Sequence, residues 1–107
     1  GARNLSFFDA PVGLIFTLDR SFCESQIIDL GLYVQSVMLV ADEKGLATCP
    51  QASWSMWAGI VRDVLGLASN EMVMLGMALG YADPDAPVNQ LNQPRVDVTE
   101  FTQLHGF

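Results

Sequence analysis

The segment from about Ser25 to Lys44 narrows the possible folds more than any other part of the chain, because it is apolar on nearly every side of a helix. One side carries apolar residues at helical spacing, namely Ile27, Leu30, Val34, Val37, Met38 and Ala41. Much of the other side is filled by Leu32, Tyr33, Leu39 and Val40. Such a helix has to be buried on more than one face, and in a small domain this favours a central helix at a dimer interface.

Three other segments predict strands. Residues Val12 to Leu18 form a continuous apolar, β-branched run that is typical of a buried strand. A short extended piece is expected over residues 47–50, and a longer apolar strand over residues 71–81. Gly76 and Gly80 interrupt that last strand, and glycine in a strand marks a bulge or the close approach of another group.

The helix ends carry the usual signals. Ser21 with Glu24 has the spacing of a capping box, and Ser25 is a second plausible cap for the long helix. Gly45 predicts the end of that helix. A second helix is expected from Ser53 to Leu65, followed by a terminating glycine.

Composition excludes several classes of function. Half of the residues are hydrophobic and 16% are charged, which is too apolar for a disordered segment. Net charge is −7 and the five basic residues are scattered, so we expect no nucleic-acid partner. No signal peptide, membrane span or lipidation motif is visible, which predicts a cytoplasmic protein with no membrane partner.

The residue types that build catalytic or metal sites are sparse. Cys23 and Cys49 make no disulfide framework and are expected to be reduced thiols. His105 is the only histidine, so we expect no metal site and no nucleophile activated by histidine. No pair of carboxylates is placed for acid–base catalysis, and we name no catalytic residue.

The end of the chain differs in composition from the rest. A turn-rich break over residues 83–87 begins a polar stretch with spaced apolar anchors at Val96, Val98, Phe101, Leu104 and Phe107. We therefore divide the chain into residues 1–82, which form the domain, and residues 83–107, which form an extended arm laid over a surface.

The string from Thr48 to Ser53 carries the clearest functional signal. An extended segment that runs directly into a helix presents free backbone N–H groups at the positive end of the helix dipole. Such a place can hold an electron-rich edge of a ligand. Taken without its context, the Pro50-Gln51 pair is also compatible with a simple turn that leads into a helix.

Three segments in order, residues 8–17, 45–51 and 79–84, resemble those of the FMN-dependent nitroreductase family, and the resemblance covers essentially the whole chain. It implies an α+β fold, with a mixed sheet, flanking helices and an intertwined homodimer. FMN at the dimer interface would take a hydride from NAD(P)H and pass electrons to nitroaromatic or quinone-like acceptors.

The resemblance assigns roles to five residues. Pro50 resembles the proline that packs against the flavin ring, and Gln51, Ala52 and Ser53 resemble the turn whose backbone N–H groups approach flavin N5 and O4. Arg95 resembles the basic residue that pairs with the FMN phosphate, a task that suits a guanidinium. Gln93 departs from the pattern, since many members carry a second basic residue at that place.

Length is the larger departure, because family chains are about twice this long. This chain resembles the C-terminal half, so we expect a partial domain that is completed by dimerisation. The family's remaining phosphate, ribose and pyrimidine contacts come from the other half. The alternative hypothesis is a non-catalytic dimerisation module derived from this fold that no longer binds flavin.

Overall fold

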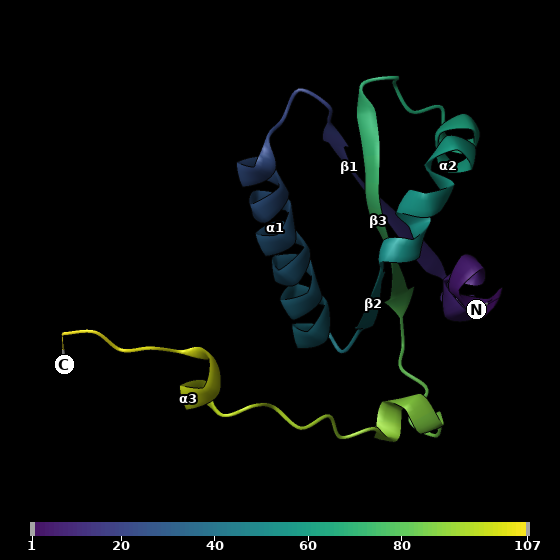
Figure 1. Ribbon diagram of the computed structural model, residues 1–107. Coiled ribbons are helices and arrows are strands. Elements are labelled where there is room, and N and C mark those ends of the chain that lie inside the picture. The colour runs from purple at the N-terminus through teal and green to yellow at the C-terminus, as the bar shows by residue number, and fades with distance from the viewer. Residues whose placement is uncertain (1, 107) are drawn as a thin grey trace.

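The computed structural model describes residues 2–106, which form one small sheet with helices around it and an extended C-terminal stretch (Figure 1). In chain order the elements are the 3₁₀ turn η1 (Ala2–Asp9), β1 (Val12–Asp19), α1 (Glu24–Glu43), β2 (Ala47–Gln51), the 3₁₀ turn η2 (Ala52–Trp57), α2 (Ala58–Leu65), β3 (Glu71–Gly80), the 3₁₀ turn η3 (Pro87–Gln90) and α3 (Val98–Phe101). The α+β class and the three predicted strands are confirmed.

The sheet has the strand order β1-β3-β2, and both pairings in the described part of the chain are antiparallel. β3 is the last strand in the sequence but lies in the middle, so β1 and β2 run in the same direction on either side of it. The central strand also carries half of the buried apolar residues in the described part of the chain, since Met77 is fully buried and Val73 and Ala78 are each only 5% exposed. The small core of this chain is therefore centred on β3.

As expected, glycine in β3 marks a close approach, and a bulge lies in the same strand. A Cβ atom on Gly76 would lie 2.2 Å from Cδ1 of Trp54, so only glycine leaves room for that indole on the sheet. The register shifts where Phe16 lies opposite Leu75 and Thr17 lies opposite Val73, so the residue without a partner is Met74 of β3, two positions before Gly76.

The start of α1 differs from the prediction. Ser21 does not cap the helix; its N–H and hydroxyl both donate to the Asp19 carboxylate, at 2.8 and 2.7 Å. The N-cap is Cys23, whose backbone N–H donates to Oε1 of Gln26 at 3.1 Å. The expected capping box of Ser21 and Glu24 is therefore wrong, because the acidic residue that ends β1 engages the serine first.

The second helix also begins later than predicted. Residues 52–57 form the 3₁₀ turn η2, and α-helical geometry starts only at Ala58. The Ser55 hydroxyl donates to the Ala52 carbonyl at 2.8 Å, which fits a tight first turn. The two predicted helix ends are confirmed, since Gly45 and Gly66 adopt left-handed backbone angles, with φ of 71° and 64°.

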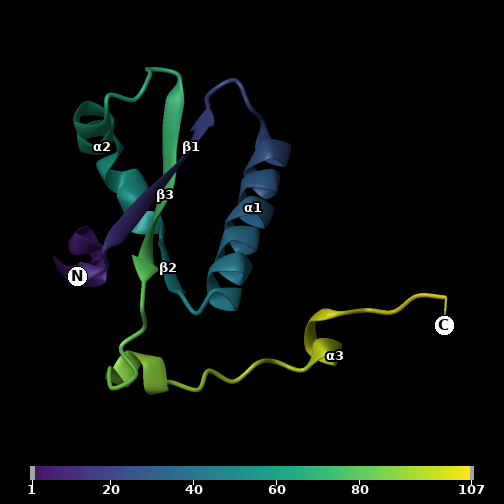
Figure 2. The ribbon, with the colours of Figure 1, turned by 180° about the vertical axis from the view of Figure 1, so that it is seen from behind.

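α1 lies beside the sheet with much of its surface uncovered (Figures 1 and 2). Its buried residues are Val34 and Ala41, whereas Ile28, Leu32 and Leu39 are 65%, 65% and 61% exposed. An apolar groove of about 460 Å³ separates α1 from β1. The burial on several faces that the sequence predicts is thus not reached within a single chain.

After β3 the chain leaves the sheet, and η3 and α3 are joined by extended backbone that leads away from it (Figures 1 and 2). The arm's apolar anchors Val96, Val98, Phe101 and Leu104 are 63% to 75% exposed, and Phe107 lies outside the described residues. Over residues 2–106, no helix is long and apolar enough to span a bilayer.

Candidate functional site

The candidate site is the segment that joins β2 to η2, called here the Pro50–Ser53 loop. Pairing with β3 places Pro50 opposite Met77 and Gln51 opposite Gly76. Pro50 and Ala52 are exposed, Ser53 is partly buried, and Gln51 is only 3% exposed. The loop therefore exposes Pro50 and Ala52 to solvent, while the side chain of Gln51 between them is buried in the protein.

Asn4 of the N-terminal turn η1 holds this loop by hydrogen bonds. Nε2 of Gln51 donates to both the backbone carbonyl and the side-chain Oδ1 of Asn4, each at 2.6 Å. Nδ2 of Asn4 in turn donates to the Ser53 hydroxyl at 3.0 Å. Oε1 of Gln51 is buried and has no hydrogen-bond partner among the described residues.

Trp54 follows the loop directly and packs within this chain. Its ring stacks on Phe7, with the ring centroids 4.4 Å apart and the planes 17° apart, and it covers the space left by Gly76. This tryptophan therefore has a packing role within the chain. Trp57, the other tryptophan, is 43% exposed.

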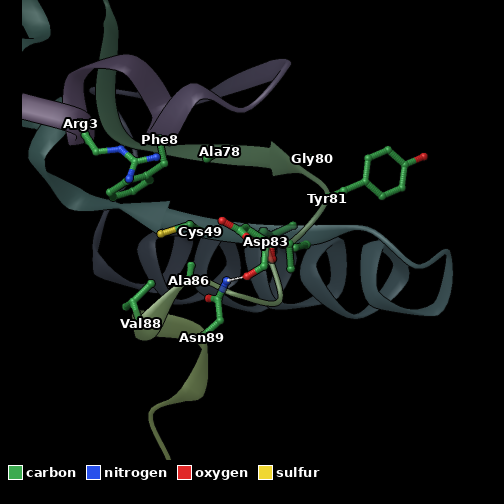
Figure 3. Close-up of a pocket in the computed structure, with 13 residues that line it drawn as sticks. Arg3, Phe8, Cys49, Ala78, Gly80, Tyr81, Asp83, Ala86, Val88 and Asn89 are labelled. Atoms are coloured by element: carbon green, nitrogen blue, oxygen red, sulfur yellow. Dashed lines mark hydrogen bonds between the residues drawn. The ribbon is translucent and has the colours of Figure 1, made fainter.

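A hollow of about 370 Å³ lies beside the loop, between η1, the ends of β2 and β3, and the turn before η3 (Figure 3). Phe8, Cys49 and Val88 contribute much of its apolar lining, while Tyr81 points away from it and is 81% exposed. None of the residues from Pro50 to Ser53 lines the hollow.

Two polar side chains that line this hollow, those of Arg3 and Asn89, already have partners. Arg3 pairs with Asp9 at 3.3 Å, and Nδ2 of Asn89 donates to the Asp83 carbonyl at 2.7 Å (Figure 3). Arg3 is the basic residue among those that line the hollow. The hollow is therefore better suited to an apolar or aromatic group than to a phosphate.

Arg95 lies on the arm, in the stretch between η3 and α3. It is exposed, and its guanidinium donates to the Gln93 carbonyl at 3.3 Å. That stretch leads away from the sheet and from η2 in both views (Figures 1 and 2). The single chain thus leaves Arg95 apart from the Pro50–Ser53 loop, and its phosphate role stays a prediction.

The lowered pKa values belong to three residues in turns outside the loop. The Ser21 hydroxyl lowers the pKa of Asp19, and the Thr99 hydroxyl does the same for the pKa of Asp97. Hydrogen bonding to Ser25 lowers the pKa of the Cys23 thiol at the start of α1. Each shift has a local structural cause.

No cluster of three or more His, Cys, Asp or Glu side chains that could hold a metal ion occurs within residues 2–106. Sequence reasoning named the four residues of the loop but missed Asn4 and Phe7, which support it from the far N-terminal end of the chain. Only the strand pairing and the left-handed turn in η1 bring them there, and neither leaves a local sequence signal.

Comparison with known proteins places this geometry in a family. The sequence model of the Nitroreductase family matches residues 1–81. A 4-nitrobenzoate reductase of Pseudomonas putida is 44% identical over 104 residues, which are 97% of this chain and 46% of that protein. A chloronitrobenzene nitroreductase of Comamonas testosteroni is 47% identical over 100 residues, 94% of this chain and 44% of that protein.

Solved structures agree with these matches. The FMN and NADPH-dependent nitroreductase NfnB from Sphigopyxis sp. strain HMH superposes with a TM-score of 0.95 at 42% identity, over 98% of this chain and 47% of that one. The FMN-dependent NfnB from Mycobacterium smegmatis, in complex with NADPH, gives 0.91 at 34% identity, over 96% and 46%. This chain spans less than half the length of these relatives, and it belongs to the Nitroreductase family.

Proposed function

We propose that this chain provides part of an FMN-dependent oxidoreductase that passes electrons from NAD(P)H to nitroaromatic or quinone-like acceptors. The observation that carries the proposal is the Pro50–Ser53 loop, which is exposed at Pro50 and Ala52 yet is held from behind by Asn4 and the Phe7–Trp54 stack. Two relatives are named for the reduction of 4-nitrobenzoate and chloronitrobenzene, and two structural neighbours are named FMN-dependent.

The residues present fit the ring end of FMN. Pro50 offers an exposed apolar surface at the edge strand β2, and an apolar hollow of about 370 Å³ lies beside the loop. Ala52 and Ser53 are the first residues of η2, where backbone N–H groups lack helical partners. Arg3, the basic residue at the hollow, is paired with Asp9, so this proposal places the phosphate elsewhere.

In this proposal Pro50 packs against the flavin ring, and the N–H groups of Gln51, Ala52 and Ser53 face its N5 and O4 edge. Donors at that edge favour the reduced ring, where electron density gathers. Arg95 pairs with the phosphate. When bound, FMN supplies the hydride chemistry, and the protein supplies orientation and electrostatics.

The partner is proposed to be a second copy of the chain. Support comes from the exposed apolar surface of α1 and from the arm, whose anchors touch little in the single chain. We keep the division into a domain over residues 1–82 and an arm over residues 83–107. A cytoplasmic location is part of the same proposal, and Cys23 and Cys49 are both free thiols.

The alternative, a dimerisation module without flavin, is not favoured. The proteins that this chain resembles in sequence and fold are named as reductases. In addition, the Pro50–Ser53 loop keeps a network of supporting hydrogen bonds that a purely structural module does not need. NADPH appears in the names of both structural neighbours, which suits a nicotinamide donor.

The test is the visible absorption spectrum of the 107-residue protein after FMN is added and excess ligand is removed by gel filtration. We expect a retained flavin band that NAD(P)H bleaches in the absence of oxygen. Riboflavin, which has the same ring but no phosphate, is the control and should be retained less. Loss of both ligands on the column would exclude flavin binding by this chain, and equal retention of the two would indicate unspecific adsorption.

A further inference from the structure

The N-terminal turn η1 reaches the candidate site through Asn4, which lies 47 residues from Gln51 and 49 from Ser53 in the sequence. Its two side-chain polar atoms and its backbone carbonyl are all used there. The carbonyl and Oδ1 accept from Nε2 of Gln51, and Nδ2 donates to the Ser53 hydroxyl. One asparagine thus bonds to both Gln51 and Ser53, which are two positions apart in the Pro50–Ser53 loop.

Burial makes these bonds consequential. Gln51 is 3% exposed, and its Oε1 has no partner among the described residues, so the hydrogen bonds of this buried side-chain amide are those from Nε2 to Asn4. Without Asn4 the Nε2 group would also lose its partners. The Gln51 amide would then regain hydrogen bonds only by moving toward water, and the Pro50–Ser53 loop would move with it.

Phe7 supports the same loop from a turn whose backbone conformation is unfavourable. Phe7, Phe8 and Asp9 all have left-handed backbone angles, with φ of 51°, 57° and 64°, which residues with a Cβ atom rarely adopt. The Phe7 ring lies on Trp54 and over Gly13, where a Cβ atom would come within 2.5 Å of Cε2 of that ring. Such a conformation persists only where the surroundings hold it in place.

We propose that Asn4 is a positioning residue that holds the Pro50–Ser53 loop in the conformation that receives FMN. The proposal rests on the proposed function for its consequence, since the loop has to contact flavin for its order to affect binding. Asn4 itself touches no reacting atom; it acts through Gln51 and Ser53.

The first test measures loop order without any ligand. Hydrogen–deuterium exchange is followed in peptides over residues 50–57 and over β1 and β3, in the full chain and in Asn4→Ala. We expect exchange in the loop peptide to be about three- to tenfold faster in the variant, as for the loss of one or two hydrogen bonds, with little change in the strands. Asn70→Ala is the matched control, because it removes an asparagine bond to Asp19 at the other end of the sheet.

Two further variants distinguish an effect that acts through the hydrogen bonds of Asn4 from a general loss of stability. Asn4→Asp keeps an acceptor for Gln51, and the Ser53 hydroxyl can turn to donate to it, so protection of the loop should return. Ser53→Ala removes only the second bond and should give a smaller effect. Combining it with Asn4→Ala should add nothing if the asparagine acts through Ser53.

The second test measures FMN affinity by quenching of flavin fluorescence in the same variants. Asn4→Ala should raise the FMN dissociation constant about three- to tenfold, and Asn4→Asp should restore most of the affinity. Unchanged exchange in the loop, or equal acceleration throughout the strands, would overturn the positioning role. So would faster loop exchange with unchanged affinity. If the wild-type chain binds no FMN, this chain does not form a flavin site by itself, and the exchange data alone decide whether Asn4 holds the loop.

Discussion

At the scale of single residues, Gly76 decides whether the loop and its tryptophan can lie on the sheet. A Cβ atom there would lie 2.2 Å from Cδ1 and 2.8 Å from Cγ of Trp54. Gly76→Ala should therefore destabilise the protein by about 1–3 kcal/mol, the usual cost of overpacking, because the indole has to leave its place on Phe7. Urea unfolding monitored by tryptophan fluorescence measures this change.

Gly59→Ala is the control for that substitution. Gly59 is exposed on α2, and a Cβ atom added there would have no other group within 4 Å, so alanine should be neutral or stabilising by up to about 1 kcal/mol. Equal unfolding free energies for wild type and Gly76→Ala would mean that the packing of Trp54 on β3 is not needed for stability.

At the scale of elements, α1 carries more apolar surface than one chain can cover. Leu32 is 65% exposed on a helix whose buried residues are Val34 and Ala41. If a second copy covers this surface, Leu32→Glu places a charge in a dry interface and should raise the dimer dissociation constant about a hundredfold or more. Light scattering coupled to gel filtration gives the mass directly.

The matched control on another helix is Val64→Glu. Val64 is 76% exposed on α2, so the same charge at a similarly apolar position should leave the dimer intact. Dissociation by Val64→Glu with a stable Leu32→Glu dimer would move the interface to α2. A wild-type chain that is monomeric at all concentrations would contradict the proposed homodimer.

At the scale of the whole molecule, the chain is more extended than its length requires. Its radius of gyration is 16.9 Å, whereas a compact domain of this length has about 13 Å. The arm accounts for much of the difference, since it leads away from the sheet (Figures 1 and 2). A site that uses both the loop and the arm therefore needs the arm to meet a loop in the assembled protein.

Arg95→Ala tests that requirement. Loss of a charged hydrogen bond to phosphate should weaken FMN binding by about 1–3 kcal/mol and leave riboflavin binding unchanged. Arg20→Ala is the control, because Arg20 is an exposed arginine that donates to the Ser69 carbonyl. Equal losses for FMN and riboflavin, or none for FMN, would remove Arg95 from the phosphate site.

Much of this architecture was predictable because it depends on local patterns. Helical spacing located α1 to within one residue, and Gly45 and Gly66 marked helix ends, since only left-handed backbone closes those turns easily. The loop residues were also named from their place between a strand and a helix. The predicted N-cap of α1 was wrong because a neighbouring residue competes for the serine hydroxyl: Ser21 donates to Asp19 instead of capping α1.

By itself, then, the sequence determined the identity and approximate bounds of the elements, and through its motifs the family. Only the tertiary structure decided the order β1-β3-β2, the delayed start of α2 and the link from Asn4 to the Pro50–Ser53 loop. The physical reason is the range of the interactions. Propensity and periodicity act over a few neighbouring residues, whereas strand order and the Asn4 link depend on contacts between residues that are tens of positions apart.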